Sequence, residues 1–422
     1  MKLFPSLFKK DKTSTDHAIA LDIGTEIVKA LIFRISRDKE KGIVVGVGRS
    51  PQQLGDMRSG AVTDISGVVS TCQKAISEAE KMAGGLSVQQ AIIGIAGELV
   101  KGSTITIHYE RLKPEVKIDL AELKNIVQKV QKKAFDKVRA EISWESGWSE
   151  IDVRLINAAI VDVKIDGYRV TNPLGFQGKD VSISVFNAYA PLIHLGALQT
   201  IASDLGLDLL SIAAEPYAIA RCFGMEDQTE FSAIFMDVGG GTTDIAIVKS
   251  GGLEGIKMFA LGGRVFTKRI SQELGVSFKE AEEMKIKYSK KKLSAVESQK
   301  IAKILEKDCQ IWLSGVELAL GEFSKIELLP TRILLCGGGS KLPEIQKALK
   351  ESDWMKSLPF TRRPSVDFIK PQDVSNIIDE TKTLNDPQDI TPMGLANLAL
   401  DLAGEEKLLA KILRKVVRMM QT

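Results

Sequence analysis

The sequence predicts an α/β protein with two related lobes, each built on a β-hairpin suited to phosphate binding. In residues 235–248, an apolar run, three glycines and a second apolar run indicate a hairpin. Residues 18–33 repeat this pattern, with Asp22 in the position that Asp237 holds 215 residues later. A third glycine-rich turn, at 337–340, follows a later apolar strand. Two such hairpins suggest duplicated half-domains that could hold one phosphate chain between them.

Glycine suits a phosphate clamp because no Cβ hinders the approach of backbone N–H groups. In the second hairpin, Thr242 and Thr243 could add hydroxyl donors, and Asp237 ends the first strand, where it could hold Mg²⁺ through water. A single hairpin of this kind is also consistent with an ordinary glycine-rich turn. The pair is more specific, since Asp22 and Asp237 would then face one metal ion. No lysine follows the glycines, so this is not a GxxxxGK[ST] loop.

Composition argues against several functional classes. The net charge of +3 is too near neutral for a nucleic-acid-binding body, and 6% aromatic residues are few for base stacking, so no nucleic-acid partner is expected. Four scattered cysteines and three histidines form no zinc motif and favour a reducing compartment. No apolar run reaches the ~18 residues that span a bilayer. Residues 1–15 are expected to form a flexible basic arm.

The first part of the chain alternates predicted strands and helices, and then its character changes. A strand at 43–48 precedes a helix capped by Asp64 or Ser66. From 97 to 180 the pattern becomes short strands around a charged helix near 119–138. No catalytic constellation occurs there, so this segment is interpreted as an inserted interaction subdomain.

A carboxylate marks the junction between the two hairpins. Glu215 follows a predicted strand, where it could orient an attacking water or simply favour the first turn of the next helix. Beyond the second hairpin, Gly262 and Gly263 open a helix. Glu282 and Lys285 lie three apart on the next helix, as a surface ion pair or as ribose contacts. Three further segments are expected: an amphipathic helix at about 295–324, a polar surface loop at 370–390 and a final body helix at 391–403.

Residues 405–422 form the most distinct feature outside the hairpins. At ~100° per residue, apolar and basic side chains occupy opposite halves of a helical wheel. The apolar half includes Leu408, Leu409, Ile412, Leu413 and Val416, and the basic half includes Lys411, Arg414 and Lys415. A cationic amphipathic helix is typical of an interfacial membrane anchor. The alternative is that its apolar face packs on the protein's own body, but the segregated basic residues favour the anchor.

Taken together, the two hairpins and the glycine turn at 337–340 resemble the phosphate and adenosine motifs of the actin and heat-shock-chaperone ATPase superfamily. Within that superfamily, the chain is similar to the FtsA family of bacterial cell-division proteins. The supporting stretches follow the family's order and cover residues 16–420. They are residues 60–65, 94–97, 172–178, 261–263, 280–288 and the terminal helix.

The resemblance implies an actin-like (ribonuclease H-like) α/β fold of two lobes, with an α+β subdomain inserted in lobe one. It divides the chain as follows: basic arm 1–15; lobe one 16–83, 181–211 and 385–404; SHS2-like inserted subdomain 84–180; lobe two 212–262 and 330–384; outer subdomain of lobe two 263–329; membrane-targeting helix 405–422.

The resemblance also implies that ATP and Mg²⁺ bind in the cleft between the lobes. Asp22 and Asp237 would face the metal through water, and Glu215 would place the attacking water, so these three would be the catalytic residues of a weak or regulatory ATPase. The residues expected to contact the nucleotide are Gly24, Thr25, Lys29, Gly239, Gly240, Gly241, Thr242, Gly262, Gly263, Glu282, Lys285, Gly338, Gly339 and Ser340.

A protein of this kind would form filaments, bind the C-terminal peptide of FtsZ and attach to an anionic membrane surface through its terminal helix. It would lie on the cytoplasmic face of the inner membrane at the division site. Three features depart from the family's pattern. Arg269 stands where an aspartate is usual, and almost no linker precedes the terminal helix. No short motif marks the surface with which the family binds FtsZ.

Two alternatives share parts of this pattern. The first is a PilM-like adaptor of type IV pilus assembly, which has similar hairpins, an inserted subdomain and the Asp22-to-Lys29 spacing, and which binds a partner peptide. The second is a metabolic kinase of the same superfamily. A kinase needs a carboxylate base beside a small-molecule pocket, and the sequence offers no such candidate.

Overall fold

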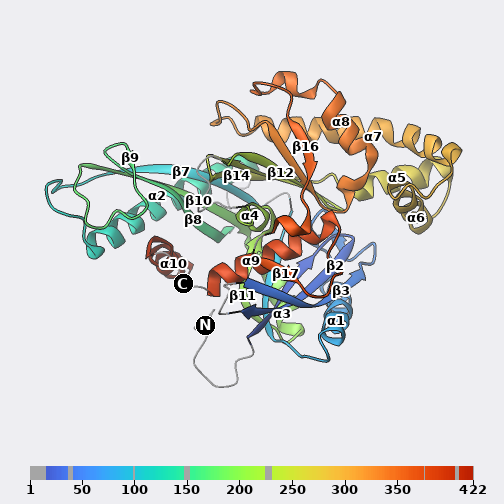
Figure 1. Cartoon of the computed structure of the whole chain (residues 1–422), viewed down its shortest axis with the longest axis horizontal. Helices are drawn as coiled ribbons and strands as arrows, with labels where there is room; N and C mark the ends of the chain where they lie inside the picture. The colour runs from blue at the N-terminus through green and yellow to red at the C-terminus, as the bar shows by residue number, and fades with distance from the viewer. Residues whose placement is uncertain are drawn as a thin grey trace.

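The computed structural model describes residues 16–36, 41–97, 100–146, 153–223, 231–374, 376–403 and 408–421. Figure 1 shows two lobes and a third body. Lobe one lies at the lower centre, lobe two at the upper right, and the inserted subdomain extends to the left.

Lobe one is built on a six-stranded sheet. In order across the sheet, its strands are β11 (Asp208–Ala214), β6 (Gln90–Ile95), β1 (His17–Ile23), β2 (Ile27–Ser36), β3 (Lys41–Pro51) and β17 (Ile377–Asp379). β1, β2 and β3 are successive antiparallel strands, whereas β6 and β11 run parallel to β1. β17 is a short edge strand inside the segment 370–390, which the sequence predicts as a loop because three residues carry no readable period.

Lobe two begins with the same arrangement. In order, its strands are β16 (Ser365–Phe368), β15 (Arg332–Cys336), β12 (Ala233–Val238), β13 (Thr243–Lys249) and β14 (Gly252–Phe259). β12, β13 and β14 are antiparallel, and β15 and β16 run parallel to β12. Position by position, this order matches β11-β6-β1-β2-β3, so each lobe starts from its own glycine hairpin. A small ladder of β4 (Met57–Arg58) and β5 (Ala61–Val62) lies outside both sheets.

The inserted subdomain continues the sheet of lobe two. β14 pairs with β7 (Lys101–Glu110), and the sheet then runs through β10 (Asp180–Pro191), β8 (Val153–Ile165) and β9 (Tyr168–Arg169). β10 pairs with β7 and β8 along its length, so the sheet of the subdomain extends past the expected boundary at 180. Helix α2 (Leu120–Ser146) packs on this sheet and is longer than the segment 119–138 expected from the sequence.

Helices surround the sheets, and local signals define several of their starts. Asp64 caps α1 by accepting from the backbone N–H of Gly67. Capping boxes at Ser277 and Ser294 begin α6 and α7. The helices are α1 (Ile65–Met82), α3 (Leu192–Asp204), α4 (Glu215–Arg221), α5 (Gly263–Leu274), α6 (Phe278–Ser289), α7 (Ala295–Gly321), α8 (Pro343–Glu351), α9 (Ile390–Ala403) and α10 (Leu408–Gln421), with short 3₁₀ turns at Gly339–Lys341, Trp354–Ser357, Pro371–Asp373 and Pro387–Asp389.

Candidate functional site

The two glycine hairpins meet at a cavity of about 90 Å³ between the lobes. A Cβ on Gly240 would lie 2.7 Å from Cβ of Glu26, and one on Gly241 would lie 2.6 Å from Oγ1 of Thr25. The hairpin of lobe two therefore rests directly on the hairpin of lobe one, and only glycine allows this approach. The predicted residues that line the cavity are Asp22, Gly24, Thr25, Lys29, Glu215, Asp237, Gly239, Gly240, Thr242 and Gly338.

Cross-strand register places two charged pairs at the cavity. Asp22 pairs with Lys29 across the first hairpin, and their side chains form a salt bridge of 2.7 Å. In the second hairpin, Asp237 pairs with Asp244, which also lines the cavity. Asp244 is absent from the predicted site. Extending the hairpin repeat by one strand would have found it, since both pairs are seven residues apart.

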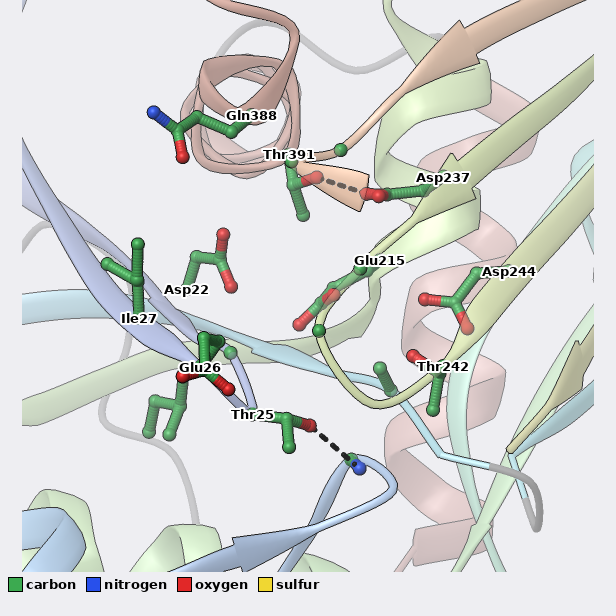
Figure 2. A pocket seen from close by; sticks show the side chains of 18 of the residues that line it. Asp22, Thr25, Glu26, Ile27, Glu215, Asp237, Thr242, Asp244, Gln388 and Thr391 are labelled. Atoms are coloured by element: carbon green, nitrogen blue, oxygen red, sulfur yellow. Dashed lines mark hydrogen bonds between the residues drawn. The ribbon is translucent and has the colours of Figure 1, made fainter. Parts of the chain in front are cut away.

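Glu215 reaches the cavity from the first turn of α4. The side chain is buried, and Figure 2 shows it between Asp22 and Asp244. Gly94 on β6 makes room for it, because a Cβ there would lie 2.7 Å from Oε1 of Glu215. Glu215 therefore lies in the first turn of a helix and also lines the cavity, so the two interpretations offered by the sequence are compatible.

Crowding of carboxyl groups changes their acidity. Burial raises the pKa of Glu215 well above its ordinary value, and the charges of Asp22, Asp244 and Asp237 add to this rise. Burial also raises the pKa of Asp237 and Asp244. For Lys29, burial alone would lower the pKa, but the charge and hydrogen bond of Asp22 outweigh it, and the net direction is upward. The cavity therefore favours bound cations and protons.

Residues from remote segments complete the cavity, and the sequence did not predict them as site residues. The hydroxyl of Thr391, at the start of α9, donates to Oδ2 of Asp237 (Figure 2). The backbone N–H of Gly60 donates to Oγ1 of Thr25 at 3.1 Å. Gln388 contributes a further wall. The two hydrogen bonds join segments more than 30 residues apart, so no local sequence motif predicts them.

Several predicted residues support the cavity instead of lining it. A Cβ on Gly262 would lie 2.8 Å from the carbonyl oxygen of Gly239, and the N–H of Gly263 donates to that oxygen at 2.9 Å. Gly339 packs on Val238, and Ser340 donates to the carbonyl oxygen of Gly337 at 2.6 Å. These residues hold the glycine turns in place.

Glu282 and Lys285 are engaged with each other and with α5. The Lys285 ammonium is 2.7 Å from Glu282, and it donates to the carbonyl oxygen of Gly263 at 3.0 Å and to Oγ1 of Thr267 at 2.8 Å. Lys285 is buried, and neither residue lines the cavity between the lobes. Contact with a ribose would require this network to rearrange.

A second cavity, of about 640 Å³, adjoins the first. The segments 337–341 and 385–388 contribute to the walls of both cavities. The larger cavity also takes Ser289 and Lys291 from the end of α6 and Phe368 from β16. Small-molecule sites commonly span ~300–1,000 Å³, so the second cavity has the size for a nucleoside and the first does not.

The carboxylate set fits a hydrated divalent cation. In the described part of the chain, Oδ1 of Asp244 is buried without a hydrogen-bond partner. Mg²⁺ prefers oxygen ligands and retains several waters. Asp22, Asp237 and Asp244 would accept hydrogen bonds from such waters. A bound cation would also offset the mutual repulsion that raises the pKa of Glu215.

Arg264 closes the mouth of the cleft. From the first turn of α5 in lobe two, its guanidinium donates to Oε2 of Glu26 at 2.6 Å and to the carbonyl oxygens of Thr25 at 2.7 Å and Met57 at 2.8 Å, all in lobe one. A nucleotide could enter the smaller cavity only if the lobes moved apart, and this movement would break these bonds.

Arg269, which replaces the expected aspartate, lies away from the cavity. Its guanidinium forms a bidentate salt bridge with Asp308 of α7, at 2.8 and 2.9 Å. Asp308 is buried, so the pair pins α5 to α7 within lobe two. The substitution therefore has a structural partner inside the same lobe.

The terminal helix differs from the expected free anchor. Leu409, Ile412, Leu413 and Val416 of α10 are 2–8% exposed and belong to one packed cluster with α2 and β8. The structure thus shows the alternative weighed for this segment, in which the apolar face packs on the body. Of the other membrane-facing predictions, Leu408 and Arg414 are half-buried, and Lys411 and Lys415 are exposed. The expected linker 404–406 and the basic arm 1–15 lie outside the described residues.

Two comparisons of the sequence with known proteins find similarity to proteins of the same name. The model of "Cell division protein FtsA" matches residues 234–394. The protein of that name from Pseudomonas aeruginosa is 27% identical over 77% of this chain and 78% of its own length. The protein of the same name from Neisseria meningitidis is 27% identical over 91% of this chain and 90% of its own length. Among solved structures, a PilM–PilN type IV pilus biogenesis complex matches with a TM-score of 0.61 at 18% identity, over 92% of this chain and 98% of that one. Within the described residues, every helix is too short or too polar to cross a bilayer.

Proposed function

Because the chain belongs to the FtsA family of the actin-like ATPase superfamily, we propose that it is an ATP-binding cell-division protein that links FtsZ filaments to the membrane. The observation that carries the nucleotide part is the pair of glycine hairpins, facing each other across Asp22, Lys29, Asp237 and Asp244.

The geometry supports Mg²⁺-ATP as the ligand. The triphosphate would lie between the hairpins, where the backbone of Gly24 and Gly240 lines the cavity without side-chain obstruction. The N–H of Gly239 instead closes the second hairpin by donating to the carbonyl oxygen of Thr242 at 2.9 Å. Asp22 and Asp237 would hold the waters of a bound Mg²⁺, which would supply positive charge to offset that of the phosphates. Glu215 accepts a proton from, or orients, the water that would attack the γ-phosphate. The nucleoside would occupy the adjoining cavity beside Lys341.

Titration calorimetry with ATP, in the presence and absence of Mg²⁺, tests this assignment. Asp237→Asn should reduce Mg²⁺-dependent affinity at least tenfold, because the metal-facing carboxylate is lost. The matched control is Asp308→Asn, which alters an equally buried aspartate away from the cavity. Equal affinity of the wild type and Asp237→Asn would contradict the cleft assignment.

Membrane attachment would use the basic and apolar halves of α10. Lys411 and Lys415 already face solvent, and each basic residue near an anionic surface contributes ~1 kcal/mol. The apolar half would enter the interfacial region after leaving the body. This would place the protein on the cytoplasmic face of the inner membrane at the division site, where it would form filaments and bind the C-terminal peptide of FtsZ.

A second candidate is a peptide-binding adaptor that resembles PilM. The docked position of α10 favours this candidate, because such an adaptor does not need a free amphipathic helix. Pull-down experiments with the C-terminal peptide of FtsZ and with a cytosolic pilus-partner peptide separate the two. Capture by the FtsZ peptide alone supports the division role, and capture by the pilus peptide alone replaces it.

A further inference from the structure

The terminal helix α10 is integrated into the core of the inserted subdomain. Leu409, Ile412, Leu413 and Val416 share one cluster with residues of α2 and β8, and α10 contacts both of these elements. In Figure 1, α10 lies beside the inserted subdomain. We call the partner residues the α10 docking surface. They are the buried members of the same cluster in the two elements that α10 contacts, namely Leu123, Ile126, Val127 and Val130 of α2, and Val163 and Ile165 of β8.

A polar contact fixes the helix at a second point. The guanidinium of Arg414 donates to the carbonyl oxygen of Leu402, in the last turn of α9, at 3.1 Å. A helix leaves its last carbonyls without intrahelical partners, so this bond also satisfies the end of α9. The docked helix is therefore held by lobe one as well as by the inserted subdomain.

In the docked helix, the apolar side is buried against the protein and the basic side faces solvent. The apolar residues are buried, whereas Lys411 and Lys415 remain exposed. An anionic surface could therefore attract the docked helix, but the apolar half could not enter lipid without leaving α2 and β8. One apolar face cannot be buried in protein and in lipid at the same time.

We propose that the inserted subdomain is an intramolecular binding site for α10 that competes with the membrane, so that attachment requires release of the helix. This inference rests on the proposed membrane attachment and deepens it by naming its regulation. The apparent affinity for lipid is reduced by the fraction of molecules with a released helix, so a helix released in about one molecule of a hundred binds about a hundredfold more weakly. Any partner that loosens α2 or β8 would then promote attachment.

Hydrogen exchange of the full-length protein, with and without vesicles, tests the competition. The vesicles contain phosphatidylglycerol and phosphatidylcholine, with pure phosphatidylcholine vesicles as the control. On binding to the anionic vesicles, amides of α2 and β8 should exchange severalfold faster, while those of α10 stay protected. Binding to vesicles without any change in α2 and β8 would overturn the competition, although membrane attachment itself would stand.

Two variants give an independent readout by vesicle co-sedimentation. Val127→Ala weakens the docking surface without touching α10 and should raise the bound fraction severalfold. Val68→Ala, an equivalent change in the buried face of α1, should leave it unchanged. Leu413→Glu should release α10 even without lipid, seen as faster exchange in α2 and β8, and should also prevent sedimentation. If neither the wild type nor Val127→Ala sediments with vesicles, the proposed membrane attachment is wrong. If Leu413→Glu leaves the hydrogen exchange of α2 and β8 unchanged, the proposed docking of α10 on these elements is wrong.

Discussion

At the residue scale, the cleft is defined by two cross-strand pairs in equivalent positions of the duplicated hairpins. Asp22 lies opposite Lys29, and Asp237 lies opposite Asp244. The two hairpins therefore share an aspartate at the first position and differ at the second, which is a cation in lobe one and a carboxylate in lobe two. Lobe one neutralises its own aspartate, with a salt bridge of 2.7 Å. Lobe two keeps two carboxylates together, and Mg²⁺ would be attracted to that side.

Glu215→Gln should stabilise the metal-free protein, and the gain should grow with pH. A carboxyl group whose pKa is raised by folding keeps its proton more firmly in the folded state. It therefore costs no stability below its ordinary pKa of 4.5, and costs more as the pH rises through the raised value. Each pKa unit corresponds to ~1.4 kcal/mol.

Thermal unfolding in EDTA, at intervals from pH 4.5 to 8, measures this effect for Glu215→Gln. The control, Glu306→Gln, removes an exposed carboxylate of α7. Parallel pH profiles for the wild type and Glu215→Gln would show that Glu215 is not destabilised by its surroundings.

At the element scale, pairs of segments are held together by contacts that no local pattern reveals. The bidentate pair of Arg269 and Asp308 joins α5 to α7. Arg414 joins α10 to the end of α9. Each of these contacts bridges two helices that the sequence predicts separately, so the helices were predictable and their pairing was not.

Arg269→Asp, which introduces the aspartate expected from the family resemblance, should destabilise lobe two. It removes the partner of a buried carboxylate and places a second negative charge beside it, so the charge of Asp308 is left uncompensated. The charge swap Arg269→Asp with Asp308→Arg should recover part of that loss. Thermal unfolding of the single and double variants gives the coupling energy, and a coupling near zero would show that the pair does not pin the helices.

The sequence predicts the repeated parts of this molecule well and the long-range parts poorly. Asp22 and Asp237 hold equivalent positions near the ends of the first strands of the two repeated hairpins, and Glu215 follows a predicted strand. The repeat itself predicts that the two aspartates face each other between the lobes. Thr391 and Gly60 reach the cavity from distant segments. Gly262 packs on the second glycine hairpin, and Lys285 bonds to the start of α5. A sequence motif does not distinguish residues that hold such segments in place from residues that contact a ligand. The apolar stripe of α10 predicts burial but cannot tell protein from lipid.

At the scale of the whole molecule, Arg264 couples the state of the cleft to the position of the lobes. Its guanidinium spans the cleft mouth and donates to four residues of lobe one, which are Thr25, Glu26 and Met57 at 2.6–2.8 Å and Leu54 at 3.4 Å. Thr25 is itself a wall of the cavity. Opening the lobes and releasing a phosphate chain would therefore occur together, because the same segment carries both contacts.

Arg264→Ala should speed nucleotide exchange. Net contributions of ~0.5–1.5 kcal/mol for each hydrogen bond imply that loss of the three short bonds and the longer one to Leu54 favours the open arrangement by at least about 2 kcal/mol. Because every 1.4 kcal/mol is about tenfold, release of a fluorescent ATP analogue should accelerate at least tenfold, while the association rate changes less. Lys257→Ala is the matched control, since its salt bridge of 2.7 Å with Glu322 lies within lobe two. Stopped-flow displacement measures both rates. If release from Arg264→Ala is as slow as from the wild type, lobe closure does not govern retention of the nucleotide, and the closing contact must lie elsewhere along the cleft.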